Sequence, residues 1–503
     1  MEKYDIVVIG SGMGGLVCAD ILSREGYTVC VIEKNKQLGG CLQTFTRDKV
    51  IFDSGVHYIG SMDKGQSLYQ LFKYLGLMDR LKIQRMDDDV FDKIIIDNDT
   101  KEYDFAQGYE NFISRLLEDF PQEEEAIRAY CDKMQEVCSK FPLYNLRMGG
   151  EYNEKADVLE IDTQGYLESI TSDRKLQAVL AGNNALYAGQ ENKTPFYVHA
   201  LILNSYIESS YKCVDGGSQI AKYMAQNIRA HGGVIYRNME VTRIIEKDGR
   251  ISHVNTKDGR QIYGDHFISN IHPIQTLDII DSDLIKNVYR RRLKSLNNSI
   301  SSFTVNIVFK EESFEYFKHN YYYHKEGYIW KLDQYTEENW PLGYALFVSA
   351  SSRSPKYAQG MTLLTYMRYD EVAKWKDTFN TVSDEDDRGE EYLEFKRKKA
   401  EKLIDLVEEK FPGLRSKIKS YHTASPLSYR DYIGNEDGSM YGIAKDYKDP
   451  LRTFISPRTK IPNLYFTGQN LNLHGVLGAA MSGLVTCTAL MGNESVIEKV
   501  KNA

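Results

Sequence analysis

Three glycines near the start of the chain have a spacing that can hold phosphate groups. Gly10, Gly12 and Gly15 stand in the pattern G-x-G-x-x-G. The first glycine allows a tight turn, the second leaves the backbone open to a phosphate, and the third lets the following helix pack closely. The free N–H groups and the dipole at the start of that helix then attract a pyrophosphate. The chemistry that this spacing predicts is the binding of a dinucleotide.

The segments around these glycines have the pattern needed to position them. Residues 5–9 (DIVVI) form a short apolar run typical of a buried parallel strand, and residues 16–22 repeat apolar side chains at helical spacing. A second predicted strand, 28–33, ends at Glu33, roughly 20 residues downstream, where a ribose hydroxyl needs an acceptor. This order favours a dinucleotide site over an ordinary glycine-rich turn. The further contacts expected here are Ser11, Met13, Gly14 and Lys34.

A second group of small residues lies near the end of the sequence. Residues 464–467 (LYFT) form a predicted strand, and a predicted helix rich in small residues spans 476–491. The N–H groups of its first turn could face a negatively charged atom of a cofactor. The alternative is an ordinary packed helix. The expected cofactor contacts in this region are Gly468, Gln469, Gly475, Val476, Leu477 and Gly478.

Composition bounds the possible functions. A chain of 503 residues is expected to fold as two interleaved domains. Its net charge of -8 argues against nucleic acid or an anionic membrane as the main partner. Seven cysteines without a C-x-x-C pattern indicate reduced thiols, and we expect no metal site. The sequence has no run of about 18 apolar residues and no room for a signal peptide before the first strand, so we expect a cytoplasmic protein.

Four segments spread over nearly the whole chain resemble one family of flavoproteins. They are FDSGVHYIG (52–60), DGGSQIAKYMAQNIRAHGGVI (215–235), ASPLSYRDYIGNEDGSMYG (424–442) and PNLYFTGQNLNLHGVLGAAMSGLV (462–485). They are similar to the retinol saturase, carotenoid isomerase and phytoene desaturase family of FAD-dependent oxidoreductases. This chain departs from the family at Asn470, where an acid is common. It also lacks the N-terminal targeting region of the animal members, which leaves their membrane location open for this protein.

The resemblance implies an α/β fold. We expect a Rossmann-like, NAD(P)-binding type of FAD-binding domain, as in amine oxidases and phytoene desaturases, with an interleaved α+β substrate domain. The FAD-binding domain would comprise residues 1–62, 211–275 and 421–503, and the substrate domain or lid residues 63–210 and 276–420. The cofactor implied is non-covalent FAD. Its further contacts would be Gly39, Gly40, Gly55, Val56 and Val241.

The resemblance also implies a reaction. Such an enzyme would reduce or isomerise a C=C bond of a hydrophobic polyene, retinoid-like or carotenoid-like, or of another unsaturated lipid. The protein must then position the bond, exclude water and supply a proton. His57 and Tyr58 are the first candidates for the active site, with His57 either an acid or a residue that only orients the flavin or its loop. Tyr432 and Tyr441 are weaker candidates.

Several questions stay open at this stage. An amine or amino-acid oxidase, and a flavin-fold escort or binding protein without redox activity, are the alternative functions. The apolar stripes of two predicted helices, within 67–78 and 109–120, would either pack in the core or form a lid that lines a lipid tunnel or touches a membrane surface. The electron donor (NAD(P)H or another flavoprotein) and the oligomeric state are not given by the sequence.

Overall fold

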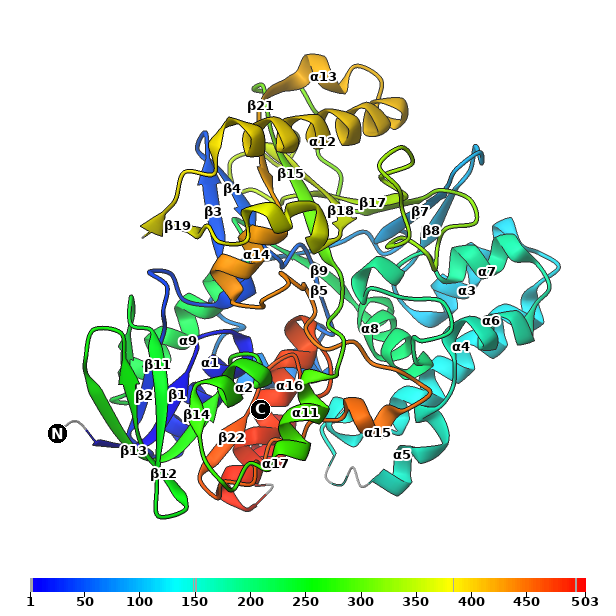
Figure 1. Ribbon diagram of the computed structural model, residues 1–503. Coiled ribbons are helices and arrows are strands. Elements are labelled where there is room, and N and C mark those ends of the chain that lie inside the picture. Colours follow the sequence, from blue (N-terminus) through cyan, green and yellow to red (C-terminus); the bar gives the residue numbers. More distant parts are fainter. Residues whose placement is uncertain (1–2, 148, 150–151, 383, 494) are drawn as a thin grey trace.

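A computed structural model describes residues 3–147, 149, 152–382, 384–493 and 495–503. Figure 1 shows two large sheets, one at the lower left and one above it, with a group of helices beside them. Segments from distant parts of the sequence make up each sheet, so the chain crosses between the two units several times.

The first sheet has eight strands in the order β10-β2-β1-β13-β12-β11-β14, and β22 also pairs with β13. The pairs that join β10, β2, β1, β13 and β22 are parallel, whereas β12 pairs antiparallel with both β11 and β13, so that these three strands form a meander. Their bounds are β1 Lys3–Ile9, β2 Val29–Ile32, β10 Val234–Tyr236, β11 Val241–Lys247, β12 Arg250–Thr256, β13 Gln261–Ser269, β14 Ile280–Asp281 and β22 Leu464–Phe466. The predicted strand, helix, strand order at the start of the chain is confirmed.

Three helices pack together beside this sheet: α1 (Met13–Arg24), α9 (Ser218–Ala230) and α16 (Gly475–Met491). A Cβ atom at Gly15 would lie 2.3 Å from the carbonyl oxygen of Gly10, so only glycine allows α1 to approach β1 this closely. A Cβ atom at Gly483 would lie 2.9 Å from the carbonyl oxygen of Gly14. The small residues of α16 therefore bring it into close contact with α1.

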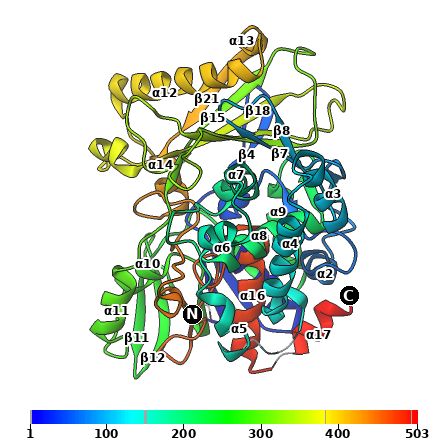
Figure 2. The ribbon, with the colours of Figure 1, turned by 90° about the vertical axis from the view of Figure 1, so that its right-hand side faces the viewer.

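The second sheet has seven strands in the order β21-β15-β18-β17-β16-β7-β8. All of its pairs are antiparallel except β16 with β7. Figure 2 shows α12 (Gly389–Lys410) above this sheet and α6 and α8 below it. The strand bounds are β7 Asp92–Ile96, β8 Glu102–Phe105, β15 Ser301–Phe309, β16 Asn320–His324, β17 Gly343–Val348, β18 Gly360–Met367 and β21 Ile418–Ala424.

The remaining elements connect and cover the two sheets. The helices are α2 Ser67–Tyr74, α3 Tyr109–Asp119, α4 Glu124–Ser139, α5 Tyr152–Leu159, α6 Thr163–Ile170, α7 Arg174–Leu180, α8 Phe196–Glu208, α10 Pro273–Asp278, α11 Asn287–Lys294, α13 Leu414–Lys417, α14 Pro426–Ile433, α15 Pro450–Thr453 and α17 Ser495–Lys501. The short strands are β3 Thr44–Arg47, β4 Val50–Asp53, β5 Ile59–Gly60, β6 Ile83–Arg85, β9 Ser210–Cys213, β19 Asn380–Thr381 and β20 Asp384–Glu385.

The two predicted amphipathic helices within 67–78 and 109–120 are α2 and α3, and both pack in the core. α2 buries Leu68, Leu71 and Phe72 in the core beside the first sheet. α3 buries Phe112 and Leu116 in the core of the second unit. Because these side chains pack in the protein interior, the lid interpretation of both stripes has no support in the structure.

The proposed domain boundaries stay a prediction, and two strand pairs bear on them. β14 pairs with β11, so the first sheet extends beyond residue 275 to residue 281. β21 pairs with β15, so the second sheet includes residues up to 424. The boundaries expected after residues 275 and 420 thus each fall within a sheet that continues for a few more residues.

Candidate cofactor and substrate site

One cavity of about 770 Å³ is lined by segments from both sheets and from the loops between them. Its walls include most of the residues that the sequence singles out. These are Gly10, Ser11, Gly12, Met13, Gly14, Glu33, Lys34, Gly39, Gly40, Gly55, Val56, His57, Tyr58, Val241, Gly468, Gln469, Gly475 and Val476. Gly15, Leu477 and Gly478 are not part of its lining.

The two glycine-rich segments of the first unit meet at one end of the cavity. Gly12 and Gly39 form an isolated parallel bridge, and a Cβ atom at Gly40 would lie 3.3 Å from the Cα atom of Gly12. A Cβ atom at Gly12 would lie 2.7 Å from Nδ2 of Asn270. Gly12 is the N-cap of α1, no side chain caps the helix there, and its first turn carries no acidic residue. The N–H groups of that turn are therefore available to an anion.

Glu33 lies at the end of β2 and is buried beside the glycine loop. Its Oε2 accepts hydrogen bonds from the backbone N–H of Ser11 (3.0 Å) and from the Ser11 hydroxyl (2.6 Å). Its Oε1 accepts from the N–H of Asn35 (2.8 Å). The carboxylate thus holds the glycine loop in place. Oε2 already accepts two hydrogen bonds, whereas Oε1 accepts one and keeps a lone pair that a ribose hydroxyl could use.

A second helix start faces the same cavity. The N-cap of α16 is His474, whose side chain makes no capping bond to the helix; its Nε2 instead bonds the carbonyl oxygen of Leu186 at 2.8 Å. Gly475 and Val476 line the cavity, but Gly478 does not. A Cβ atom at Gly478 would lie 2.6 Å from the carbonyl group of Leu473, so this glycine serves packing.

The opposite end of the cavity is aromatic. The His57 ring stacks on Phe347 with centroids 4.2 Å apart, Tyr58 stacks on Tyr206 at 4.2 Å, and Tyr441 stacks on His474 at 4.1 Å. Phe347 and Tyr322 come from neighbouring strands of the second sheet. We call this wall the aromatic end; its members are His57, Tyr58, Tyr206, Tyr322, Phe347 and Tyr441.

His57 faces the cavity, but its ionisation differs from the sequence-based expectation. Burial, together with the positive charge of Lys212, lowers the pKa of His57 to about 4. The imidazole is therefore neutral at neutral pH and lacks the proton that a histidine acid would donate. This pKa does not favour His57 as the acid, and its catalytic role stays a prediction.

Behind the aromatic end lies a polar cluster that sequence reasoning did not find. Asp92, the first residue of β7, is fully buried. It accepts hydrogen bonds from the Tyr58 hydroxyl (2.8 Å), from Nδ2 of Asn320 (2.9 Å) and from Nδ2 of Asn183. The Tyr58 and Tyr322 hydroxyls are 2.8 Å apart. Burial raises the pKa of Asp92 to about 7.

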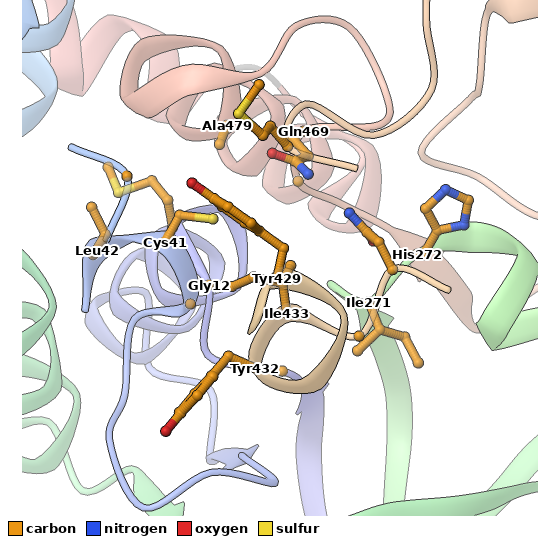
Figure 3. A pocket seen from close by; sticks show the side chains of 18 of the residues that line it. Gly12, Cys41, Leu42, Ile271, His272, Tyr429, Tyr432, Ile433, Gln469 and Ala479 are labelled. Carbon is orange, nitrogen blue, oxygen red and sulfur yellow. The ribbon is translucent and has the colours of Figure 1, made fainter. Parts of the chain in front are cut away.

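Other cavity residues were also missed. Figure 3 shows Tyr429 extending from α14 into the cavity, with Cys41 and Gln469 on either side of it in this view. Asn270 directly follows β13, a position at the carboxyl end of a parallel strand where ligands commonly bind, so strand order could have indicated it. The weaker candidates Tyr432 and Tyr441 do line the cavity. Further residues of the lining are Leu42, Tyr206, Ile271, His272, Tyr322, Phe347 and Ile433.

Comparison with known proteins identifies the family. The model of the family described as flavin containing amine oxidoreductase matches residues 13–491. The chain belongs to this family. A flavin-containing family and a dinucleotide-binding motif together mean FAD, so the predictions of an FAD-dependent oxidoreductase and of its Rossmann-like fold are confirmed.

The chain is similar to individual relatives along nearly its whole length. Human all-trans-retinol 13,14-reductase is 27% identical and the match covers 100% of this chain and 87% of the relative. Prolycopene isomerase 1 from an Oncidium hybrid cultivar is 24% identical, with 99% and 85% covered. The crystal structure of an oxidoreductase from Methanosarcina mazei has the same fold, with a TM-score of 0.65, 16% identity and 98% and 100% of the two chains covered.

Membrane-spanning helices and metal-binding clusters are both absent from the described residues. Within that part of the chain, no helix is long and apolar enough to cross a membrane. In the same residues, no group of three or more histidine, cysteine, aspartate or glutamate side chains is arranged to hold a metal ion.

Proposed function

We propose that this protein reduces or isomerises a C=C bond in a long hydrophobic polyene, with FAD as the redox cofactor. The observation that carries the proposal is the aromatic end of the cavity. It belongs to the same cavity as the glycine-rich segments, and it is built from rings and uncharged hydroxyls. A conjugated apolar chain can pack against such rings, which stack on one another in offset pairs.

The residues of the cavity fit FAD. The first turn of α1 and the bare backbone at Gly12 and Gly40 suit a pyrophosphate, and Glu33 suits the adenosine ribose. The uncapped start of α16 offers N–H groups to a ring edge that becomes negatively charged on reduction. When bound and reduced, FAD supplies a hydride.

The protein's own part in such a reaction is positioning and exclusion of water. Phe347, Ala345 and Leu364 come from adjacent strands β17 and β18 and give the cavity an apolar floor. Among the described residues that form the aromatic end and this floor, none carries a carboxylate that could bind a substrate ammonium group. This supports a neutral, hydrophobic substrate over an amine.

The names of the relatives support the same substrate class. One relative is a retinol 13,14-reductase and another a prolycopene isomerase, and both names describe reactions at C=C bonds of polyenes. The electron donor, a cytoplasmic location and contact with a membrane surface stay predictions for this chain.

An anaerobic reaction tests the proposal. The purified flavoprotein is reduced with dithionite, mixed with all-trans-retinol or prolycopene, and monitored for flavin reoxidation and for product mass. Reoxidation with a product heavier by two hydrogens supports reduction, and a product of unchanged mass but altered double-bond geometry supports isomerisation. Oxygen uptake with putrescine, combined with inertness toward both polyenes, would instead establish an amine oxidase.

A further inference from the structure

A carboxyl group sits in a setting where proteins rarely place one. The Asp92 side chain is 0% exposed and lies behind the aromatic end, outside the cavity lining. A buried ionised carboxylate is costly unless nearby groups compensate it. Burial raises the pKa of Asp92 by more than the three hydrogen bonds it accepts and the nearby positive charge of Lys212 lower it. The group is therefore able to hold a proton at physiological pH.

The hydrogen bonds connect this carboxyl to the cavity. Tyr58 lies between Asp92 and Tyr322, with both oxygen–oxygen distances at 2.8 Å. Tyr58 and Tyr322 line the cavity, whereas Asp92 does not. Each phenol can both donate and accept. When Asp92 carries a proton, the hydrogen bond between Asp92 and Tyr58 reverses, so that Asp92 donates to Tyr58 and Tyr58 donates to Tyr322. A proton that leaves Tyr322 can then be replaced from Tyr58, and the proton of Tyr58 from Asp92. These hydrogen bonds form a continuous path for a proton from the buried Asp92 carboxyl to the cavity.

The sheet geometry explains why the three residues meet. In the parallel pair of β7 and β16, Asp92 lies opposite Asn320, and Tyr322 lies two residues further along. Side chains two residues apart point to the same face of a sheet. Tyr58 approaches that face from the loop before β5, and its ring is held by stacking on Tyr206.

We propose that Tyr322 is the proton donor of the reaction, and that Asp92 restores its proton through Tyr58. In the reduction of a C=C bond, one carbon takes a hydride from the reduced cofactor and its neighbour takes the hydroxyl proton of Tyr322. The π bond, the O–H bond and the bond that holds the hydride on the reduced cofactor break, two C–H bonds form, and the cofactor is oxidised by two electrons. The proton shift along the path leaves Asp92 as a carboxylate, and a proton taken up from solvent through the cavity returns to it along the same path between turnovers. The inference rests on the proposed function.

Other titratable groups near this path are less suited to the role. His57 is neutral at neutral pH, as described above. Lys212 is buried near Asp92, but its Nζ donates to the carbonyl oxygens of Val348 (2.9 Å) and His319 (3.4 Å) and it does not line the cavity. Tyr206 faces Asp92 from α8. Lys93, beside Asp92, forms ion pairs with Glu102 and Asp104.

Rapid kinetics of the reduced enzyme test the donor. Tyr322→Phe is expected to keep its flavin and to slow polyene-dependent reoxidation by about 10²–10⁴-fold, the usual contribution of a general acid. Tyr58→Phe, which interrupts the path, should also slow it. Tyr323→Phe is the matched control, because this residue is next in β16 and stacks on Tyr344, away from the cavity. It should react as fast as wild type.

The pH dependence of the reoxidation rate tests whether Asp92 supplies the proton. With wild type, the reoxidation rate should fall as the pH rises through about 7, because Asp92 then loses its proton. Asp92→Asn should be slow and should lack this titration. A merely structural role of Asp92 would lower thermal stability or flavin occupancy and leave the shape of the pH profile unchanged.

Infrared spectroscopy gives a readout that does not depend on turnover. The difference between the wild-type and Asp92→Asn spectra should contain a protonated carboxyl band at pH 6 that declines toward pH 8. The subtraction removes the band of Asp53, whose pKa is also raised to about 7. Equal infrared spectra of wild type and Asp92→Asn at pH 6 would overturn the inference, as would a Tyr322→Phe variant that reacts like wild type. If wild type itself reacts with neither all-trans-retinol nor prolycopene, the proposed function fails instead.

Discussion

Removing the Glu33 carboxylate should weaken FAD binding and, by a separate effect of similar size, destabilise the fold. In the structure, Glu33 accepts three hydrogen bonds, two from Ser11 and one from Asn35. After Glu33→Ala, the Ser11 hydroxyl can turn to another partner and the partly exposed Asn35 N–H can bind water. The buried N–H of Ser11 is left without an acceptor, which costs about 1–3 kcal/mol of folding free energy.

The loss in binding has a separate origin. If Oε1 accepts a ribose hydroxyl, that hydroxyl loses a charged acceptor, a loss of about 1–3 kcal/mol. Since about 1.4 kcal/mol is a factor of ten, the dissociation constant for FAD should rise by about 5- to 150-fold. Glu33→Gln keeps one acceptor oxygen for Ser11, so it should preserve more of the stability of the apoprotein and still bind FAD less tightly.

Two measurements separate these effects. Titration of the deflavinated protein with FAD, followed by flavin fluorescence, gives the affinity, and thermal unfolding of the same apoprotein gives the stability. An unchanged FAD affinity in Glu33→Ala would refute the assignment of Glu33 to the ribose, whatever the melting temperature does.

Three further predictions concern substitutions at Gly12, His57 and Asp53. Gly12→Val should yield colourless protein, because the new side chain would fill the space that a phosphate needs and its Cβ atom would lie 2.7 Å from Nδ2 of Asn270. Full flavin absorbance in this variant would refute the phosphate role. His57→Phe should preserve the stack on the neighbouring ring and slow polyene-dependent reoxidation by less than about tenfold, so a loss of 10²–10⁴-fold would make His57 the acid after all. Asp53→Asn should remove a pH dependence of stability. Burial raises the pKa of Asp53 from 3.8 to about 7, so the folded state keeps a proton that the unfolded state loses between these values. Because Asp92 titrates over this range in both proteins, chemical denaturation should then show that the stability of wild type falls more between pH 4 and 7 than that of the variant, by up to about 4 kcal/mol.

Local patterns in the sequence predicted the parts of the fold that depend on nearby residues. The first strand, the glycine turn, α1 and the end of β2 at Glu33 follow from apolar runs and from spacing within 30 residues. The Asp-Gly turns of the meander are equally local, and Asp248 and Gly249 have the positive φ angles that such a turn requires. The helix that closes the cavity, α16, was recognisable by its small residues.

The aromatic end could not be predicted in the same way. Asp92, Tyr322 and Phe347 come from three strands that carry no motif, and only the pairing of those strands brings them behind and beside His57. The pKa of His57 likewise depends on stacking against Phe347 and on the burial that results. Pairing across hundreds of residues and the exclusion of water are properties of the assembled fold, which a single sequence does not display.

The close contact between α1 and α16 also dictates when the protein can take up its cofactor. Gly14 and Gly483 lie against each other in the structure but leave the ribosome more than 460 residues apart. At synthesis rates of 5–20 residues per second, the glycine loop waits roughly 20–90 s for the helix that completes its site. During translation the nascent chain therefore carries an open half-site, and tight retention of FAD begins only after nearly the whole polypeptide has been made.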